Sequence, residues 1–262
     1  MDNKPHALVT NDDGIDSAFL HELVAALLPK FDVSVAAPAS EQSWIGRAMS
    51  RHSELTVQKI DQLFPEDVSA WSISGTPSDC VNIALGHLVT KPVDIVLSGI
   101  NIGFNTTETL ILSSGTVAGA IEGGLWELPA IAFSQCVPRA IFAEVSSQNG
   151  RSGPDFALNL KSAARHCTRI ALDYLEKPGP TGTVLNINFP PKTTDNTLIE
   201  DATLAKVRLG SLFAETQPGT YRFQYSDGIS HESSAHSDRA TLERGAISRT
   251  LLDFTKIGQK LP

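Results

Sequence analysis

Short apolar runs alternate with segments of helical periodicity from His6 to Pro191, and this alternation limits the possible folds more than any other feature. The first run, His6–Thr10, is followed by Ala18–Leu28, whose apolar residues fall on one stripe. The same alternation predicts further strands at Asp32–Ala37, Trp71–Ser74, Val93–Leu97, Ala130–Phe133 and Thr183–Phe189, and helices at Asp79–Val89, Thr116–Leu125 and Phe156–Leu175. Strands that alternate with crossover helices form a mostly parallel sheet covered on both faces, so we expect an α/β fold.

The pattern changes after Pro191. Residues 192–262 are more polar, contain β-like stretches at Tyr221–Tyr225 and Ala246–Leu251, and show no clear crossover helix. We therefore expect an α/β catalytic core over residues 1–191. We expect a C-terminal extension over residues 192–262, made of a hairpin and a tail and used in oligomerisation.

The charge balance bears on the kind of partner. The 262-residue chain has a net charge of −8 and a pI near 5.3, and no cluster of Lys and Arg stands out. A protein that binds nucleic acid polymers by neutralising phosphates needs a basic face, so we expect no such partner. An acidic protein still binds a small phosphorylated molecule when a metal ion supplies the positive charge.

Two further features concern the compartment. No uninterrupted apolar run approaches the roughly 20 residues that span a bilayer, and Asp12, Asp13 and Glu22 interrupt any secretory segment near the start. The cysteines, Cys80, Cys136 and Cys167, are odd in number and widely spaced, which argues against a disulfide framework and a cysteine zinc site. We expect a cytoplasmic protein without a membrane partner.

Polar clusters follow three of the predicted strands, where an open α/β sheet binds its ligands. These clusters contain Asn11, Asp12 and Asp13 after the first strand, Ser40, Glu41, Gln42 and Ser43 after the second, and Ser98, Asn101 and Asn105 after Val93–Leu97. Adjacent carboxylates repel each other unless a cation or a proton lies between them, and carboxylate, amide and hydroxyl oxygens suit Mg²⁺, Mn²⁺ or Ca²⁺. Alone, Asp-Asp-Gly is more often a capped turn, but the convergence of three strand ends favours a metal site.

The segment Ser113-Ser114-Gly115-Thr116 opens a helix. Its backbone N–H groups, hydroxyls and glycine suit an anion site, and simple helix capping explains the segment equally well. For Gly75–Asp79, which also precedes a helix, we favour a cap. A metal beside an anion site indicates metal-assisted transfer of a phosphoryl group to water.

These motifs together resemble the SurE (survival protein E) family of nucleotidases. The resemblance is clear over about residues 7–135 and weaker beyond them. It is carried by Leu8–Gly14, Ala37-Pro38 with Ser43, Gly75–Val81, Asp94–Asn105 and Ser114–Gly123, then by Leu185–Pro190 and Ser237-Asp238 with Glu243–Gly245. Several motifs in the family's order and spacing are far more specific than a lone Asn-Asp-Asp-Gly.

The resemblance implies a Rossmann-like three-layer core whose C-terminal extension is exchanged within a homodimer or homotetramer. It implies hydrolysis of nucleoside 5′- and 3′-monophosphates with one divalent metal ion per subunit, for which we expect Mg²⁺ or Mn²⁺. The family's metal ligands fall on Asp12, Asp13, Ser43 and Asn101, and its phosphate-binding positions on Asn105, Ser114, Gly115 and Thr116. We add Asn11 to the substrate-binding residues and expect Asp12, Asp13, Asn101 and Asn105 to be catalytic.

The sequence departs from the family pattern around the serine ligand. The family usually has a basic, Asn-containing stretch before this serine and Gly after it, whereas Ser40–Trp44 carries an acid and a bulky ring. The segment from Asn105 to Ser114 is one residue longer, and Ser113 stands where the family often has Tyr. We hypothesise that Trp44 lines a nucleoside pocket; packing within its loop is the alternative.

Two other functions stay open at this point. A catalytically silent nucleotide-binding protein of the same fold is one alternative, although all four ligand positions are retained. A nicotinamide-dependent oxidoreductase is disfavoured because no G-x-G-x-x-G follows the first strand. Within the hydrolase interpretation, either water or Asp12 is the nucleophile.

Overall fold

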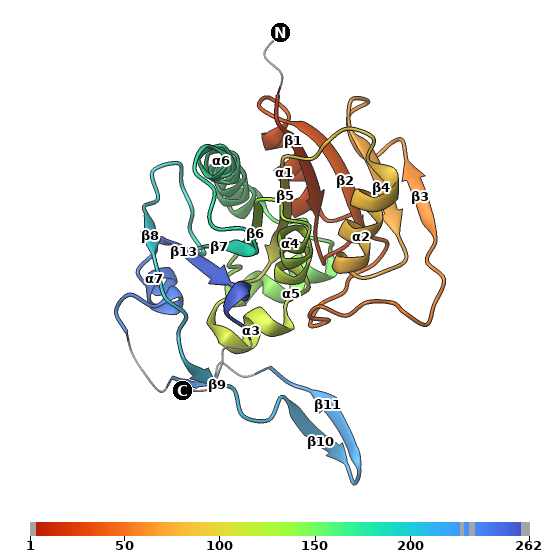
Figure 1. The fold of residues 1–262 in the computed structure, drawn as a ribbon. Helices are drawn as coiled ribbons and strands as arrows, with labels where there is room; N and C mark the ends of the chain where they lie inside the picture. The colour runs from red at the N-terminus through yellow and green to blue at the C-terminus, as the bar shows by residue number, and fades with distance from the viewer. Residues whose placement is uncertain (1–3, 226–227, 231–233, 258–262) are drawn as a thin grey trace.

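A nine-stranded, mostly parallel sheet forms the centre of the protein in the computed structural model, which describes residues 4–225, 228–230 and 234–257 (Figure 1). Its strand order is β3-β4-β2-β1-β5-β6-β7-β13-β8. The strands are β1 (His6–Thr10), β2 (Asp32–Pro38), β3 (Val57–Ile60), β4 (Ser69–Ile73), β5 (Ile95–Ile102), β6 (Ala130–Gln135), β7 (Thr183–Phe189), β8 (Ile199–Asp201) and β13 (Ile247–Asp253). Among the strands of this sheet that the structure describes, β3 and β4 pair antiparallel, as do β7 and β13, and the other neighbours pair parallel.

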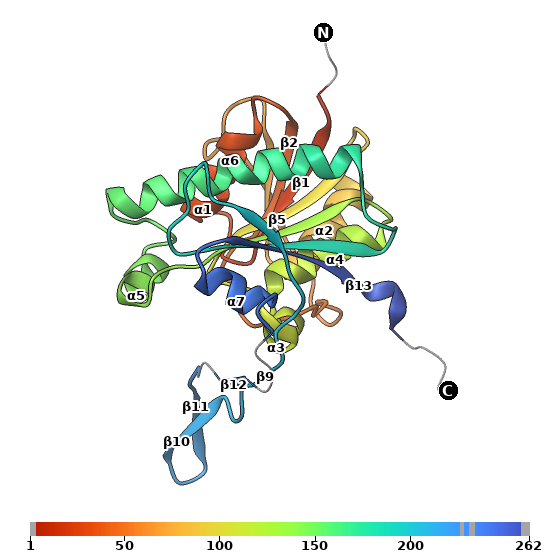
Figure 2. The ribbon, with the colours of Figure 1, turned by 90° about the vertical axis from the view of Figure 1, so that its left-hand side faces the viewer.

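Helices cover both faces of this sheet (Figure 2). Helices α1 (Ala18–Leu27) and α6 (Pro154–Glu176) lie together on one face, and α2 (Pro77–Ile83) and α4 (Gly115–Leu125) lie on the other. The remaining helices are α3 (Thr107–Ser113), α5 (Arg139–Ser147), α7 (Asp238–Glu243), a π-helical turn at Ala84–Leu88 and a 3₁₀ turn at Phe254–Lys256. The expected three-layer, Rossmann-like α/β/α architecture is confirmed.

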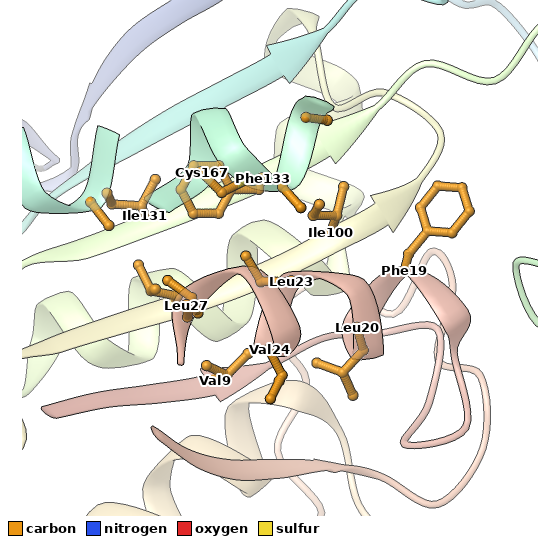
Figure 3. Close-up of a cluster of buried hydrophobic side chains, with 14 of the residues drawn as sticks. Val9, Phe19, Leu20, Leu23, Val24, Leu27, Ile100, Ile131, Phe133 and Cys167 are labelled. Carbon is orange, nitrogen blue, oxygen red and sulfur yellow. The ribbon is translucent and has the colours of Figure 1, made fainter. Parts of the chain in front are cut away.

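The larger core cluster lies between the sheet and the α1–α6 layer (Figure 3). The apolar stripe of α1 is buried against strand residues such as Val9 and Phe133, and Cys167 of α6 packs into the same cluster. Each large aliphatic or aromatic side chain buried here contributes about 1.5–3 kcal/mol relative to exposure. This core holds the carboxyl ends of the central strands in fixed positions.

The start of α2 is a capping box. Thr76 Oγ1 accepts a hydrogen bond from the backbone N–H of Asp79 at 3.2 Å, and the Asp79 carboxylate accepts one from the Thr76 N–H at 2.9 Å. The interpretation of Gly75–Asp79 as a helix cap is therefore confirmed.

The chain after Pro191 is partly built into the sheet and partly projects from it. Strand β13 lies between β7 and β8, whereas β10 (Phe213–Gln217) and β11 (Thr220–Phe223) form a hairpin that extends away from the layers in both views. Strands β9 (Val207–Arg208) and β12 (Ile229–Ser230) form a second short pair. A division at residue 191 stays a prediction, and residues 258–262 of the predicted tail lie outside the described residues. Within the described part of the chain, no helix has the length and apolar character needed to cross a membrane.

Candidate functional site

A cavity of about 780 Å³ opens at the carboxyl ends of β1 and β5. Five of the nine residues predicted for the site line it: Asp12, Ser43, Asn101, Asn105 and Ser114. They come from four separate segments of the chain, as the strand-end argument requires.

Asp12 follows β1 and is held by two parts of the chain. Its carboxylate Oδ1 accepts a hydrogen bond from the Thr116 hydroxyl at 2.5 Å, and its backbone carbonyl accepts one from the Gln42 N–H at 2.7 Å. Gly115 makes room for this carboxylate, because a Cβ there would lie 2.7 Å from the Asp12 Cβ. Asp12 is thus buried in a fixed orientation at the rim of the sheet.

Asp13 joins the end of β1 to β5. Its Oδ2 accepts a hydrogen bond from the backbone N–H of Ile102 at 2.9 Å. Ile102 itself lines the cavity beside Asn101. The two aspartates therefore lie together at the junction of the two central strands.

Burial perturbs both carboxyl groups. Desolvation raises the pKa of Asp12 to about 6, against the lowering effect of the Thr116 hydrogen bonds. Desolvation and the neighbouring Asp12 charge raise the pKa of Asp13 well above its ordinary value, and Glu41 adds to both shifts. Among the described residues, none of the ion pairs includes Asp12 or Asp13. A bound cation would relieve this unfavourable accumulation of negative charge.

Ser43 lies on the exposed loop after β2. Its hydroxyl donates to the Glu41 carboxylate at 2.6 Å, which leaves the hydroxyl oxygen's lone pairs for another partner. Two contacts hold the part of the loop after Ser43 against the helices. Arg47 forms an ion pair with Glu122 of α4 at 2.5 Å, and the Ser50 hydroxyl donates to Asp79 of α2 at 2.7 Å. Sequence reasoning missed these two anchors, because neither partner lies near the other in the chain.

Asn101 lies in β5, next to an irregularity in the strand. The pairing of β5 with β6 shifts register between Ser98 and Asn101, and Gly99 has a φ of 135°. A Cβ at Gly99 would lie 2.3 Å from the Phe133 carbonyl oxygen, so only glycine fits. This register shift directly precedes Asn101, which lines the cavity.

Asn105 is clamped by three side chains. Its amide Nδ2 donates to the Ser134 hydroxyl at 2.9 Å, and its backbone N–H donates to Asn188 Oδ1 at 2.7 Å. Its backbone carbonyl accepts from Asn186 at 2.8 Å and from Asn188 at 3.1 Å. Asn186 and Asn188 are absent from the predicted site, although their i, i+2 spacing places both side chains on one face of β7.

Of the residues at the helix start Ser114–Thr116, Ser114 lines the cavity and Gly115 and Thr116 do not. Ser114 lines the cavity and caps α4, accepting the Val117 N–H at 3.0 Å, so capping and exposure to the cavity coexist. Thr116 is fully buried with its hydroxyl on Asp12, and Gly115 is buried beside it. Asn11 is also buried, and its amide donates to the Gly14 carbonyl at 2.9 Å within the turn.

The donor set fits a hard divalent cation. Asp12, Ser43 and Asn101, whose side chains carry carboxylate, hydroxyl and amide oxygens, line one cavity, and Asp13 lies directly beside Asp12. Across residues 4–225, 228–230 and 234–257, no group of three or more His, Cys, Asp or Glu side chains is placed to hold a metal. Any metal site here therefore depends on the Ser and Asn donors.

Comparisons with known proteins agree on one family. The family model described as "Survival protein SurE" matches residues 7–211. The protein named 5′-nucleotidase SurE of Flavobacterium psychrophilum is 32% identical over 256 residues, covering 96% of this chain and 93% of that protein. The 5′-nucleotidase SurE of Nostoc sp. is 37% identical over 185 residues, 70% of this chain. The match spans 63% of the Nostoc protein's length.

A solved structure extends the agreement to the fold. The crystal structure of the SurE protein from Aquifex aeolicus superposes with a TM-score of 0.73 at 26% sequence identity. The match covers 95% of this chain and 93% of that one, so the likeness extends over nearly the whole length of both chains.

Proposed function

The chain belongs to the SurE family, and from this premise we propose that it is a divalent-metal-dependent phosphatase that hydrolyses nucleoside 5′- and 3′-monophosphates. Relatives carry the name 5′-nucleotidase. The observation that best supports the proposal is the single cavity in which Asp12, Ser43 and Asn101 meet Asn105 and Ser114.

Four residues would hold the metal in this proposal: Asp12, Asp13, Ser43 and Asn101. When bound, a Mg²⁺ or Mn²⁺ ion lowers the pKa of bound water and neutralises charge on phosphate oxygens. Two adjacent carboxyl groups with raised pKa values and hard oxygen donors around one cavity support this assignment. Thr116 orients Asp12 by donating to Oδ1, and Ile102 orients Asp13 through its backbone N–H.

Asn105 and the start of α4 would hold the phosphate. The Asn105 side chain and Ser114 both line the cavity, and hydrogen bonds from β6 and β7 fix Asn105 in place. Gly115 permits the close approach of the helix start to Asp12. We retain Thr116 and Asn11 as supporting residues of this region, since their side chains hold Asp12 and the Gly14 turn.

We further propose that the protein forms a homodimer or homotetramer through its C-terminal segment and acts in the cytoplasm. The projecting β10–β11 hairpin carries exposed Phe213, Tyr221 and Phe223, an apolar surface suited to a second subunit. The three cysteines are unpaired thiols, which suits a reducing compartment.

Phosphate release from adenosine 5′-monophosphate (AMP) with and without chelator tests the proposal. We expect Mn²⁺- or Mg²⁺-dependent turnover that Asp12→Asn and Asp13→Asn each reduce by about 10²-fold or more, as for the loss of a group that stabilises transition-state charge. Near-wild-type turnover in both variants would refute the metal-site assignment. AMP binding without phosphate release under any cation would favour the silent nucleotide-binding alternative.

A further inference from the structure

The cavity contains more than the polar groups that a phosphate requires. Besides the oxygen and amide groups around Asp12, its lining includes four aromatic side chains: Trp44, Phe104, Phe142 and Tyr225. A volume of about 780 Å³ lies in the range of sites that enclose a whole drug-sized ligand. A phosphate group alone would leave this aromatic part of the cavity without a ligand group.

Trp44 is held in an unusual backbone conformation. Its φ of 60° lies in the left-handed region, which a bulky residue rarely adopts. The position directly follows Ser43, and 39% of the residue is exposed. A large aromatic side chain kept beside the site in a disfavoured conformation indicates a functional constraint.

The indole is fixed by the end of the projecting hairpin and by the segment that follows it. Its ring centroid lies 4.9 Å from that of Phe223, with an interplanar angle of 61°, and 6.0 Å from that of Tyr225, at 55°. Both separations are in the range of favourable aromatic pairs. Two ring contacts restrict the rotation of Trp44, so little rotational freedom is left to lose when a ligand binds.

We propose that Trp44 and Tyr225 form an aromatic subsite that takes the planar base of a nucleotide, with the C-terminal segment completing it. The subsite rests on the proposed nucleotidase function, because it lies in the same cavity as Asp12 and Asn105. Base–aromatic stacking tolerates every base, since each base has a π-face. The subsite therefore selects nucleotides over base-free sugar phosphates and accepts both purines and pyrimidines.

The test compares AMP with ribose 5-phosphate, which has the same phosphate ester and no base. Trp44→Ala should lower the ratio of kcat/KM for AMP to kcat/KM for ribose 5-phosphate. We expect a decrease by a factor of about 5 to 150, the range that stacking on one aromatic ring provides. Trp44→Phe should restore most of the ratio, and Tyr225→Ala should lower it. Trp126→Ala is the matched control, because Trp126 is 43% exposed at the end of α4 and does not line the cavity. An equal fall for both substrates in Trp44→Ala would show a structural role and overturn the subsite.

A binding measurement separates this proposal from the proposed function. Adenosine is titrated calorimetrically into the unchanged protein and into Trp44→Ala. The variant should bind adenosine more weakly than the unchanged protein, by a factor of about 5 to 150. Failure of adenosine to bind the unchanged protein, or equal affinities in the two proteins, would overturn the subsite. If the unchanged protein released no phosphate from any nucleotide, the hydrolase proposal would fail, and the adenosine comparison would still decide the subsite.

Discussion

Gly115→Ala is the substitution whose effect follows most directly from the geometry of the site. A Cβ at this position would lie 2.7 Å from the Asp12 Cβ, 3.0 Å from Asp12 Oδ2 and 3.1 Å from Ile45 Cγ2. Non-bonded carbon atoms are best separated by about 3.5–4.0 Å, so Asp12 has to move by about 1 Å. The backbone of Gly115 is outside the left-handed region, and the substitution therefore perturbs the contact and not the helix start.

Two magnitudes follow from this displacement. Overpacking of a close contact destabilises a protein by about 1–3 kcal/mol, which lowers Tm by about 2–4 °C for each kcal/mol in a chain of this size. A misplacement of about 1 Å at a reacting centre lowers the rate by about 10²-fold. We expect Gly115→Ala to remain folded and to lose about 100-fold in kcat/KM for AMP with Mn²⁺.

The assay is phosphate release from AMP across a range of Mn²⁺ concentrations, together with thermal unfolding of each variant. Gly86→Ala is the matched control, since its Cβ would meet only Trp126 Cη2 at an ordinary 3.8 Å. The control should keep wild-type activity. If Gly115→Ala stayed within threefold of the wild type with unchanged Mn²⁺ dependence, the close packing of α4 against Asp12 would not matter for function, and the reasoning would be refuted.

Three further predictions concern the loop, the pH dependence and the cation. Arg47→Met leaves the buried carboxylate of Glu122 without its cationic partner, so the Mn²⁺ concentration for half-maximal activity should rise several-fold and the Tm should fall. Burial lowers the pKa of His166, whose Nε2 lies 2.8 Å from the Thr194 carbonyl and whose Nδ1 faces Arg169 at 3.0 Å. The contribution of neutral His166 to stability is complete above the unfolded pKa of 6.5 and is lost as the pH falls through the lower folded pKa. The free energy of unfolding of His166→Gln should therefore change less than that of the wild type between about pH 7 and 5. A chelator should abolish phosphate release, and Mn²⁺ at about 100 times its Kd should restore it and add about 2.7 kcal/mol to the free energy of unfolding; an unchanged Tm would contradict this.

The central strands could be predicted from the sequence because they are buried on both faces and read as short apolar runs. Strand β7, for example, has the bounds expected for Thr183–Phe189. Strand β3 was missed because its four residues, Val57–Ile60, are mostly exposed and show no buried face. Helix α7 was missed because its six residues are too few to show a clear helical period. The place of β13 between β7 and β8 could not be predicted because it depends on tertiary pairing.

The site could be predicted as a set of strand-end positions, since the carboxyl ends of parallel strands share one edge of the sheet. Its supporting contacts could not, because they join residues far apart in the chain. The hydrogen bond from Thr116 to Asp12 links positions 104 residues apart, and that from Asn105 to Asn188 links positions 83 apart. Only the folded chain shows that Thr116 binds Asp12 and that Asn105 is clamped by β7.

The most direct test of the account is a crystal structure of the protein soaked in Mn²⁺, with anomalous diffraction used to locate the ion. We predict one Mn²⁺ per subunit, with oxygens of Asp12, Asp13, Ser43 and Asn101 at about 2.0–2.2 Å, close to the distances of other small hard cations. An ion bound elsewhere, or no ion among these four side chains, would contradict the central claim.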